Sequence, residues 1–328
     1  MLHVTNGDCA ADRIARAGFG GEILPWRDVL HEGPVPANLD DAGLRARRAE
    51  FLGGPEPAAV ESALRDLEER DARLAVPSRD EIVLWFEPDL YDQLQLLQVL
   101  DRLSRDDLTE TPVTAVASVE RMGDLQKQES RELYLARIAL PAGARELAAH
   151  AWRRFRDPDP TRLEGLAARP HPELPHLQGA VRRHLEELPG LRDGLSRSER
   201  QALEALESGP LPAREAFVAA HHAREAFVFL GDLVFYSYLD RLASGNRPLV
   251  SVHRPGSRER AIPADADAVA ELTDDGRRIL DGELDWIDLG GSDRWLGGVH
   301  LAGNAAPWRW DAGDRRVIRR GRWWLRGR

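Results

Sequence analysis

Short apolar segments that alternate with helical patterns constrain the fold of the first 140 residues most strongly. Such segments lie at Leu2–Thr5, Glu22–Leu24, Ile82–Phe86 and Val113–Val119. The run Ile82–Phe86 is continuously apolar, which is typical of a strand buried on both faces of a sheet. Strands that alternate with helices indicate a parallel sheet with helices on both faces. The sequence therefore predicts an α/β, Rossmann-like domain over residues 1–140.

The pattern changes after residue 140. Residues 141–194 hold helical segments and proline-rich breaks without a strand pattern, so we expect a helical connector there. Residues 195–285 open with the capping-box sequence Ser196-Arg197-Ser198-Glu199. Three helical segments follow, the longest over residues 226–243, and then two strand segments around a charged loop. This order predicts a winged-helix-like α+β domain.

The last segment, residues 286–328, is rich in Trp and Arg, and we expect it to pack on the rest of the chain. Within it, Trp308–Trp310 and Val317–Arg320 are predicted to form a hairpin. Residues 315–328 hold seven Arg and two Trp without an acidic residue. Such a segment can bind nucleic acid, but Arg side chains stacked on Trp rings explain it more simply.

Composition argues against several classes of function. The net charge of the 328 residues is −10, whereas a general nucleic-acid binder needs a basic surface. No apolar run approaches the ~20 residues of a membrane span, and no secretory leader pattern opens the chain. One thiol, Cys9, cannot form an internal disulfide. These features favour a reducing, cytoplasmic setting.

Charge also bears on the predicted winged helix. Residues 195–285 contain 11 Arg against 16 acidic residues, and the expected recognition helix carries Asp232 and Asp240. Winged helices that read DNA need positive charges for the phosphates. We therefore expect this module to bind a protein partner or to pack internally, and nucleic acid is disfavoured.

Polar residues follow each predicted strand of the first domain. Because ligands of parallel sheets bind at the carboxyl ends of the strands, these residues predict a site. The groups are Asn6–Asp8, Trp26–Gly33, Glu87–Gln93 and Ser118–Arg121. The chain contains neither the glycine pattern of dinucleotide-binding folds nor a Walker loop. This excludes the standard dinucleotide and nucleoside-triphosphate sites.

The first turn, Asn6-Gly7-Asp8, has two interpretations. In one, it is a strand-to-helix turn with Gly7 at positive φ and Asp8 as the helix N-cap. In the other, the backbone amides of residues 7–9 hold a phosphate or carboxylate at the helix start. Arg27 could then bind the same anion through its guanidinium.

The loop after the second strand offers a candidate acid–base pair. Asp28 and His31 are three residues apart, and a carboxylate can orient an imidazole that titrates near neutrality. The alternative is an ordered loop in which Asp28 bonds backbone amides and Gly33-Pro34 shapes a turn. Both interpretations stay open from the sequence.

Three carboxylates crowd the third strand end: Glu87, Asp89 and Asp92. They could perturb each other's pKa or bind a divalent cation. Alternatively, they open a helix whose dipole favours acids in its first turn. Gln93 is expected to face the site. The adjacent His221 and His222 point in different directions on a helix, so we predict no metal site there.

The stretches HVTNGDCAADRIARAG, PWRDVLHEGPVP and LWFEPDLYDQLQLL resemble a bacterial family catalogued as domain of unknown function 1835. The resemblance covers about residues 1–120 and continues through LSRSERQALEAL and DRWLGGVHL. It supports the first domain without implying a reaction, and Cys9 stands where the family pattern suggests serine. It points to Asn6, Gly7, Asp8, Asp28, Gly33, Pro34, Asp89 and Gln93.

Together, these observations predict a protein that binds a small anionic ligand, phosphorylated or nucleotide-like, at the strand ends. The expected ligand-binding residues are Asn6, Gly7, Asp8, Arg27, Gly33, Asp89 and Gln93. The sequence leaves open whether Asp28 and His31 make it an enzyme, and it names no cofactor. The alternative is a ligand-sensing regulatory or scaffold protein whose acidic winged helix binds a protein partner.

Overall fold

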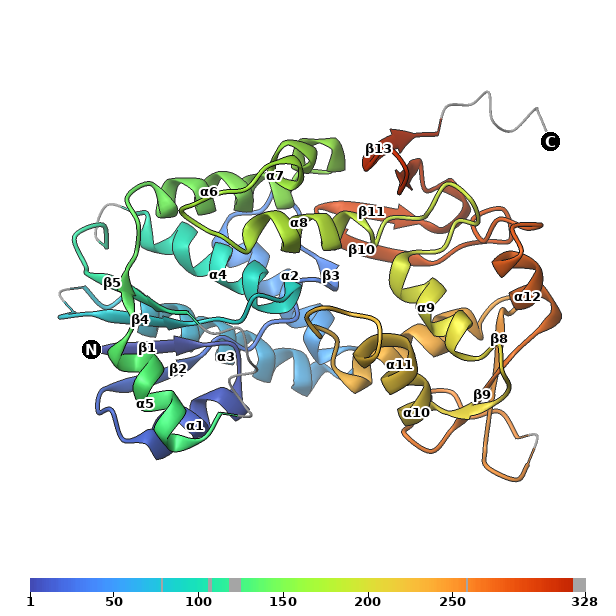
Figure 1. The fold of residues 1–328 in the computed structure, drawn as a ribbon, viewed down its shortest axis with the longest axis horizontal. Helices are drawn as coiled ribbons and strands as arrows, with labels where there is room; N and C mark the ends of the chain where they lie inside the picture. Colours follow the sequence, from blue (N-terminus) through green and yellow to red (C-terminus); the bar gives the residue numbers. More distant parts are fainter. Residues whose placement is uncertain (78, 106–107, 118–124, 258, 321–328) are drawn as a thin grey trace. The chain divides into compact units, whose positions relative to one another are not determined.

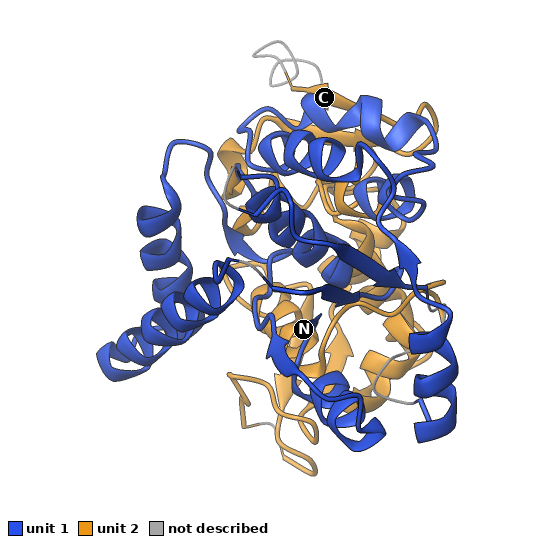
Figure 2. Ribbon diagram, turned by 90° about the vertical axis from the view of Figure 1, so that its left-hand side faces the viewer, with its two compact units in different colours: residues 1–182, 297–299 blue, residues 183–296, 300–328 orange. Residues whose placement is uncertain are grey.

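The computed structural model spans residues 1–328 and describes all of them except 78, 106–107, 118–124, 258 and 321–328 (Figure 1). The chain forms two compact units, drawn in different colours in Figure 2. Unit 1 comprises residues 1–182 and 297–299, and unit 2 comprises residues 183–296 and 300–328. The predicted α/β class is confirmed at this level.

A five-stranded, mainly parallel sheet organises unit 1. Its order is β2-β1-β4-β5-β6, and the first four strands are parallel to one another. The short strand β6 runs antiparallel to β5 and has no counterpart among the predicted strands. The strand bounds are β1 Leu2–Thr5, β2 Glu22–Pro25, β4 Ile82–Trp85, β5 Val113–Val116 and β6 Ile138–Ala139.

Helices cover both faces of this sheet, as predicted (Figure 1). On one face, α1 (Asp8–Ala17) and α5 (Lys127–Leu135) pack over a core that includes Ile14, Val83 and Trp85. On the other lie α4 (Leu90–Leu103) and α6 (Ala144–Phe155), which pack against each other. Because side chains alternate along a strand, β4 is apolar on both sides and contributes to both cores.

The remaining elements of unit 1 lie between and after these strands. The bounds are β3 Gly33–Pro34, α2 Asp41–Gly53, α3 Pro57–Leu74, η2 Pro160–Leu163, α7 Glu164–Ala168 and, across the unit boundary, α8 Leu177–Leu185.

Unit 2 contains a three-stranded antiparallel sheet in the order β7-β9-β8. The predicted capping box is confirmed, since Ser196 and Glu199 bond each other's backbone N–H at the start of α9. The bounds are α9 Arg197–Ala205, β7 Leu211–Pro212, α10 Ala213–Phe217, η3 Val218–His222, α11 Asp232–Leu242, β8 Val250–His253, β9 Val269–Leu272 and α12 Asp274–Leu280.

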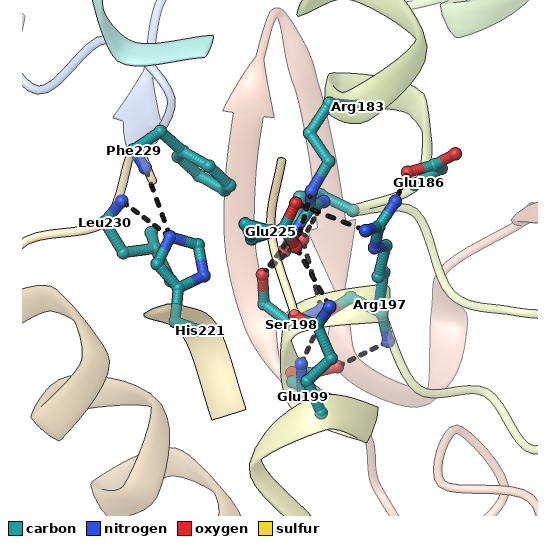
Figure 3. A network of polar contacts seen from close by, with 12 residues as sticks. Arg183, Glu186, Arg197, Ser198, Glu199, His221, Glu225, Phe229 and Leu230 are labelled. Carbon is teal, nitrogen blue, oxygen red and sulfur yellow. Dashed lines mark hydrogen bonds and ion pairs between the residues drawn. The ribbon is translucent and has the colours of Figure 1, made fainter. Parts of the chain in front are cut away.

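The predicted long helix over residues 226–243 is wrong at its start. The helix α11 begins at Asp232, and residues 223–231 form turns and a loop. His221 explains the difference, because its Nε2 accepts the backbone N–H groups of Phe229 and Leu230 at 3.2 and 3.0 Å (Figure 3). These amides are therefore held away from helical partners.

A buried ionic network ties the start of α9 to the rest of unit 2 (Figure 3). Glu187 accepts hydrogen bonds from Arg183 (2.6 Å) and from the hydroxyl of Ser198 (2.6 Å), and Arg294 lies 3.1 Å away. Arg183 also pairs with Glu225 at 3.1 Å. Burial opposes ionisation of Glu187, but its two arginines outweigh this effect and hold its pKa far below the usual range.

The predicted C-terminal hairpin is confirmed as β12 (Trp308–Asp311) paired with β13 (Arg316–Arg319). It is preceded by β10 (Asp293–Gly297), β11 (Val299–Ala302) and η4 (Gly303–Ala305). Of the basic tail 315–328, residues 321–328 lie outside the described residues. Within the described part, Arg319 lies over the ring of Trp308 at 5.4 Å, the stacking expected of a closing hairpin.

Candidate functional site

The carboxyl ends of β1 and β4 meet at the point where the strand order reverses. Thr5 of β1 pairs with Trp85 of β4, so the residues that follow both strands are neighbours. Asn6 Nδ2 donates to Asp92 Oδ1 at 2.8 Å and lies 3.5 Å from Glu87 Oε1. The structure thus brings together two of the predicted strand ends. A third predicted group, Ser118–Arg121, lies outside the described residues.

The segment after β4 folds around Asp92. Asp89 is the N-cap of α4, and its Oδ1 accepts the backbone N–H of Asp92 at 3.1 Å. Asp92 Oδ2 in turn accepts the N–H of Glu87 at 2.5 Å, and Gln93 Nε2 donates to the carbonyl of Glu87 at 2.8 Å. The interpretation of these acids as a helix start is therefore confirmed. We call Glu87, Asp89 and Asp92 the acid cluster.

Two members of the acid cluster, Asp89 and Asp92, bind protons more tightly than ordinary aspartates. Asp89 and Asp92 are 6% and 0% exposed. Burial, helped by the charge of Glu87, raises the pKa of Asp89 to about 7. Burial and the facing charges of Asp89 and Glu87 raise the pKa of Asp92 well above its usual value. The cluster can therefore hold a proton near neutral pH, and it can accept hydroxyl groups through the remaining oxygens.

Asp28 has a different environment from the one that the sequence suggested. Its Oδ1 accepts two hydrogen bonds from Arg48, at 3.0 and 2.6 Å, and Arg70 lies 3.8 Å from Oδ2. Asp28 and Arg48 are each 1% exposed. Arg48 also donates to the carbonyls of Val29 and Glu32. Asp28 is thus the counter-ion of two arginines that hold its loop in place.

Trp26 and the loop after it are anchored to α4 and to α3. The indole N–H of Trp26 donates to Gln98 Oε1 at 2.8 Å, and Arg70 lies over its ring at 4.0 Å. Gln95 Nε2 donates to the carbonyl of Asp28 at 2.9 Å. Sequence reasoning missed these glutamines, although their occurrence in the otherwise apolar LYDQLQLLQVL was a signal of buried polar contacts.

His31 lies near the candidate site through Tyr91. It is 3% exposed, and its ring meets that of Tyr91 edge-on at 5.7 Å. The Tyr91 hydroxyl donates to the carbonyl of Asn6 at 3.3 Å. Burial raises the pKa of Tyr91, so this hydroxyl stays protonated. Tyr91 was not predicted, and it connects the loop after β2 to the end of β1.

Gly33 adopts a backbone conformation that favours glycine. It has a φ of +75°, and an added Cβ would lie 2.5 Å from the ring of Phe51. Both facts exclude larger residues. The predicted turn at Gly33-Pro34 is wrong, because these two residues form the short strand β3, and both are buried.

The start of α1 is open to solvent and carries one ion pair. The predicted conformation of this turn is wrong: Gly7, with an extended φ of −179°, is the N-cap, and Asp8 is the first helical residue. Among the described residues, and apart from its two chain neighbours, no atom lies within 4 Å of a Cβ built on Gly7. Arg27 donates to both carboxylate oxygens of Asp8, at 2.6–3.0 Å, and both side chains are exposed. This pair places a cation beside a helix N-terminus.

Among the described residues, no group of three or more His, Cys, Asp and Glu side chains is arranged to hold a metal ion, and the acid cluster is no exception. None of the described helices has the length and apolar character needed to cross a membrane.

The chain matches no family model, and no curated protein matches it. Its function is therefore inferred from the geometry of the candidate site.

The two ion pairs of the site predict different costs of substitution. Asp28→Ala leaves Arg48 buried without its counter-ion, and we expect a loss of about 3–5 kcal/mol in the free energy of unfolding. Asp8→Ala removes a solvent-exposed pair, for which we expect a loss of about 0–1 kcal/mol. Urea denaturation of both variants measures the difference. Equal losses in the two variants would show that Asp28 is not the anchor described above.

The acid cluster predicts a pH-dependent effect of Asp89→Asn. Because the pKa of Asp89 is about 7 in the folded chain and about 3.9 when unfolded, the folded state binds the proton more tightly. This contribution to stability is complete below the lower value and is lost as the pH rises through the upper one. The variant keeps an N-cap acceptor and removes this loss.

We therefore expect Asp89→Asn to raise stability at pH 8 and to raise it much less at pH 5, as measured by denaturation at both values. Asp40→Asn, at the exposed N-cap of α2, measures the generic effect of this exchange at a cap. An equal change of stability at both pH values in Asp89→Asn contradicts the prediction.

Proposed function

We propose that the protein binds a small phosphorylated, nucleotide-like ligand at the carboxyl edge of the parallel sheet, between the ends of β1 and β4. The observation that carries this proposal is the strand order β2-β1-β4-β5. The chain leaves β1 toward one edge of the sheet and later returns to its other side at β4. In open α/β sheets, such a reversal opens a crevice at the carboxyl ends, and ligands bind there.

The distribution of charge in this region favours a ligand with two chemically different parts. The start of α1 offers backbone N–H groups and the helix dipole to an anion, next to Arg27. The acid cluster would repel that anion but suits hydroxyl groups, which donate hydrogen bonds to carboxylates. A sugar phosphate has both parts. Its phosphate would bind at Gly7 and Arg27, and its hydroxyls at Asp89.

The finer fold assignments belong to the same proposal. For unit 1, the strand order supports a Rossmann-like fold. For unit 2, the order α9-β7-α10-α11-β8-β9, with β7 paired to β9, supports a winged-helix-like fold. Membership of the family named above and a cytoplasmic location are consistent with this proposal.

Isothermal titration calorimetry with ribose 5-phosphate tests the proposal. We expect binding that Arg27→Ala and Asp89→Asn each weaken about tenfold, the loss of roughly one charged hydrogen bond. Arg65→Ala is the matched control, because Arg65 is an exposed arginine in an ion pair on α3. Ribose and inorganic phosphate, titrated separately, show whether both parts of the ligand contribute. Absence of binding at millimolar ribose 5-phosphate refutes the proposal.

A second candidate function is supported by an observation in unit 2. Four large apolar side chains of its described residues are exposed: Val218 (55%), Phe227 (43%), Leu233 (76%) and Ile262 (37%). Leu233 lies in the first turn of α11, beside Asp232. Apolar residues in an acidic module suit a protein partner with a basic, apolar surface. The protein would then be a ligand-sensing regulator or scaffold.

Affinity capture from a lysate of the source cells, followed by reconstitution with the purified partner, tests this second candidate. We expect Leu233→Glu to abolish the reconstituted complex, because a charge would be buried at its centre. Leu135→Glu is the control, since Leu135 is equally exposed (77%) but belongs to α5 of unit 1. A complex that tolerates Leu233→Glu rules out this surface.

A further inference from the structure

A small cavity lies beside the acid cluster on the α4 side of the sheet. Its volume is about 150 Å³, and apolar side chains make most of its lining. Strands β4 and β5 contribute Leu84 and Ala115, α4 contributes Leu96, and the segment 172–176 closes one side. Small residues leave room for the cavity here: Ala115 of β5 and Ala117, just after this strand, line it at positions that a larger side chain would fill.

One buried polar group faces this cavity. Gln93 lines it and is 4% exposed. Its Nε2 is committed to the carbonyl of Glu87, and within the described part of the chain its Oε1 accepts no hydrogen bond. This amide oxygen is an acceptor, so it can receive a hydrogen bond from a ligand with an N–H donor in the cavity.

The charged groups around the cavity restrict the ligand further. Glu173 and His176 also line it, and both are half-buried. Burial lowers the pKa of His176, which keeps its imidazole neutral at neutral pH. The carboxylate of Glu173 disfavours an anionic group. An uncharged ring with a hydrogen-bond donor fits these surroundings.

We propose that this cavity receives the base of the ligand, and that the base is a single, uncharged six-membered ring with an N–H group, as in a pyrimidine. A cavity of about 150 Å³ accommodates one benzene-sized ring. This inference rests on the proposed function for the rest of the ligand. Gln93 provides the connection, because it lines the cavity and bonds Glu87 of the acid cluster. The ligand class is thus a pyrimidine nucleoside phosphate.

Free uracil tests the cavity independently of the phosphate. We expect uracil to shift the side-chain amide resonance of Gln93 in an NMR titration of the full chain. Ala115→Phe fills the cavity and should abolish the shift, while Ala115→Ser preserves its volume and should retain it. Ile138→Trp is a second filling variant at an exposed lining position, in case Ala115→Phe does not fold. An unshifted Gln93, or a shift that survives both filling variants, overturns the inference.

Nucleotide titrations separate this inference from the proposed function. We expect uridine 5′-monophosphate to bind at least tenfold tighter than ribose 5-phosphate, and Ala115→Phe to remove this advantage. If ribose 5-phosphate binds and the uracil ring adds nothing, the cavity assignment is wrong and the proposed function stands. If uracil binds and ribose 5-phosphate does not, the reverse holds. Tighter binding of adenosine 5′-monophosphate than of the uridine nucleotide overturns the single-ring assignment.

Discussion

The pairing of β1 with β2 on one side and with β4 on the other is the constraint on which the candidate site depends. Both pairings are parallel, so the ends of the three strands lie at one edge of the sheet. From β1 the chain goes to β2 on one side, and it later returns to β4 on the other side. The helices α1 and α4 therefore start at the same edge of the sheet, where such folds bind ligands. The hydrogen bond from Asn6 to Asp92 closes this arrangement over 86 residues of sequence.

The buried carboxyl groups near this edge of the sheet have two kinds of environment. One kind serves the fold, and the other suits a binding site. Asp28 is held by two arginines, and it anchors the loop after β2. Asp89 and Asp92 face each other and Glu87, and burial raises the pKa of both. A buried carboxylate that is paired with arginines anchors its loop, whereas buried carboxyl groups with raised pKa values are suited to binding or moving a proton.

The cavity is the second feature of unit 1 that suits a ligand. It lies between the sheet and the segment 172–176, where Ala115 leaves space, and it is lined by Gln93, which bonds Glu87 of the acid cluster. In unit 2, the buried charges at the start of α9 are paired: Glu187 is surrounded by Arg183, Arg294 and Ser198. We expect the chemistry of the protein in unit 1, where the acid cluster lies, and unit 2 exposes the apolar side chain of Leu233.

The sequence by itself determined the features that depend on neighbouring residues. Examples are the buried strand β4, the helix α4 with its Asp89 cap, and the capping box at Ser196, because apolar periodicity and caps involve residues a few positions apart. Only the tertiary structure decided the role of Asp28, whose arginine partners lie 20 and 42 positions away. It also decided where α11 begins, since His221 captures the amides of Phe229 and Leu230 across a loop. Long-range partners depend on how elements pack, and a local pattern does not encode that packing.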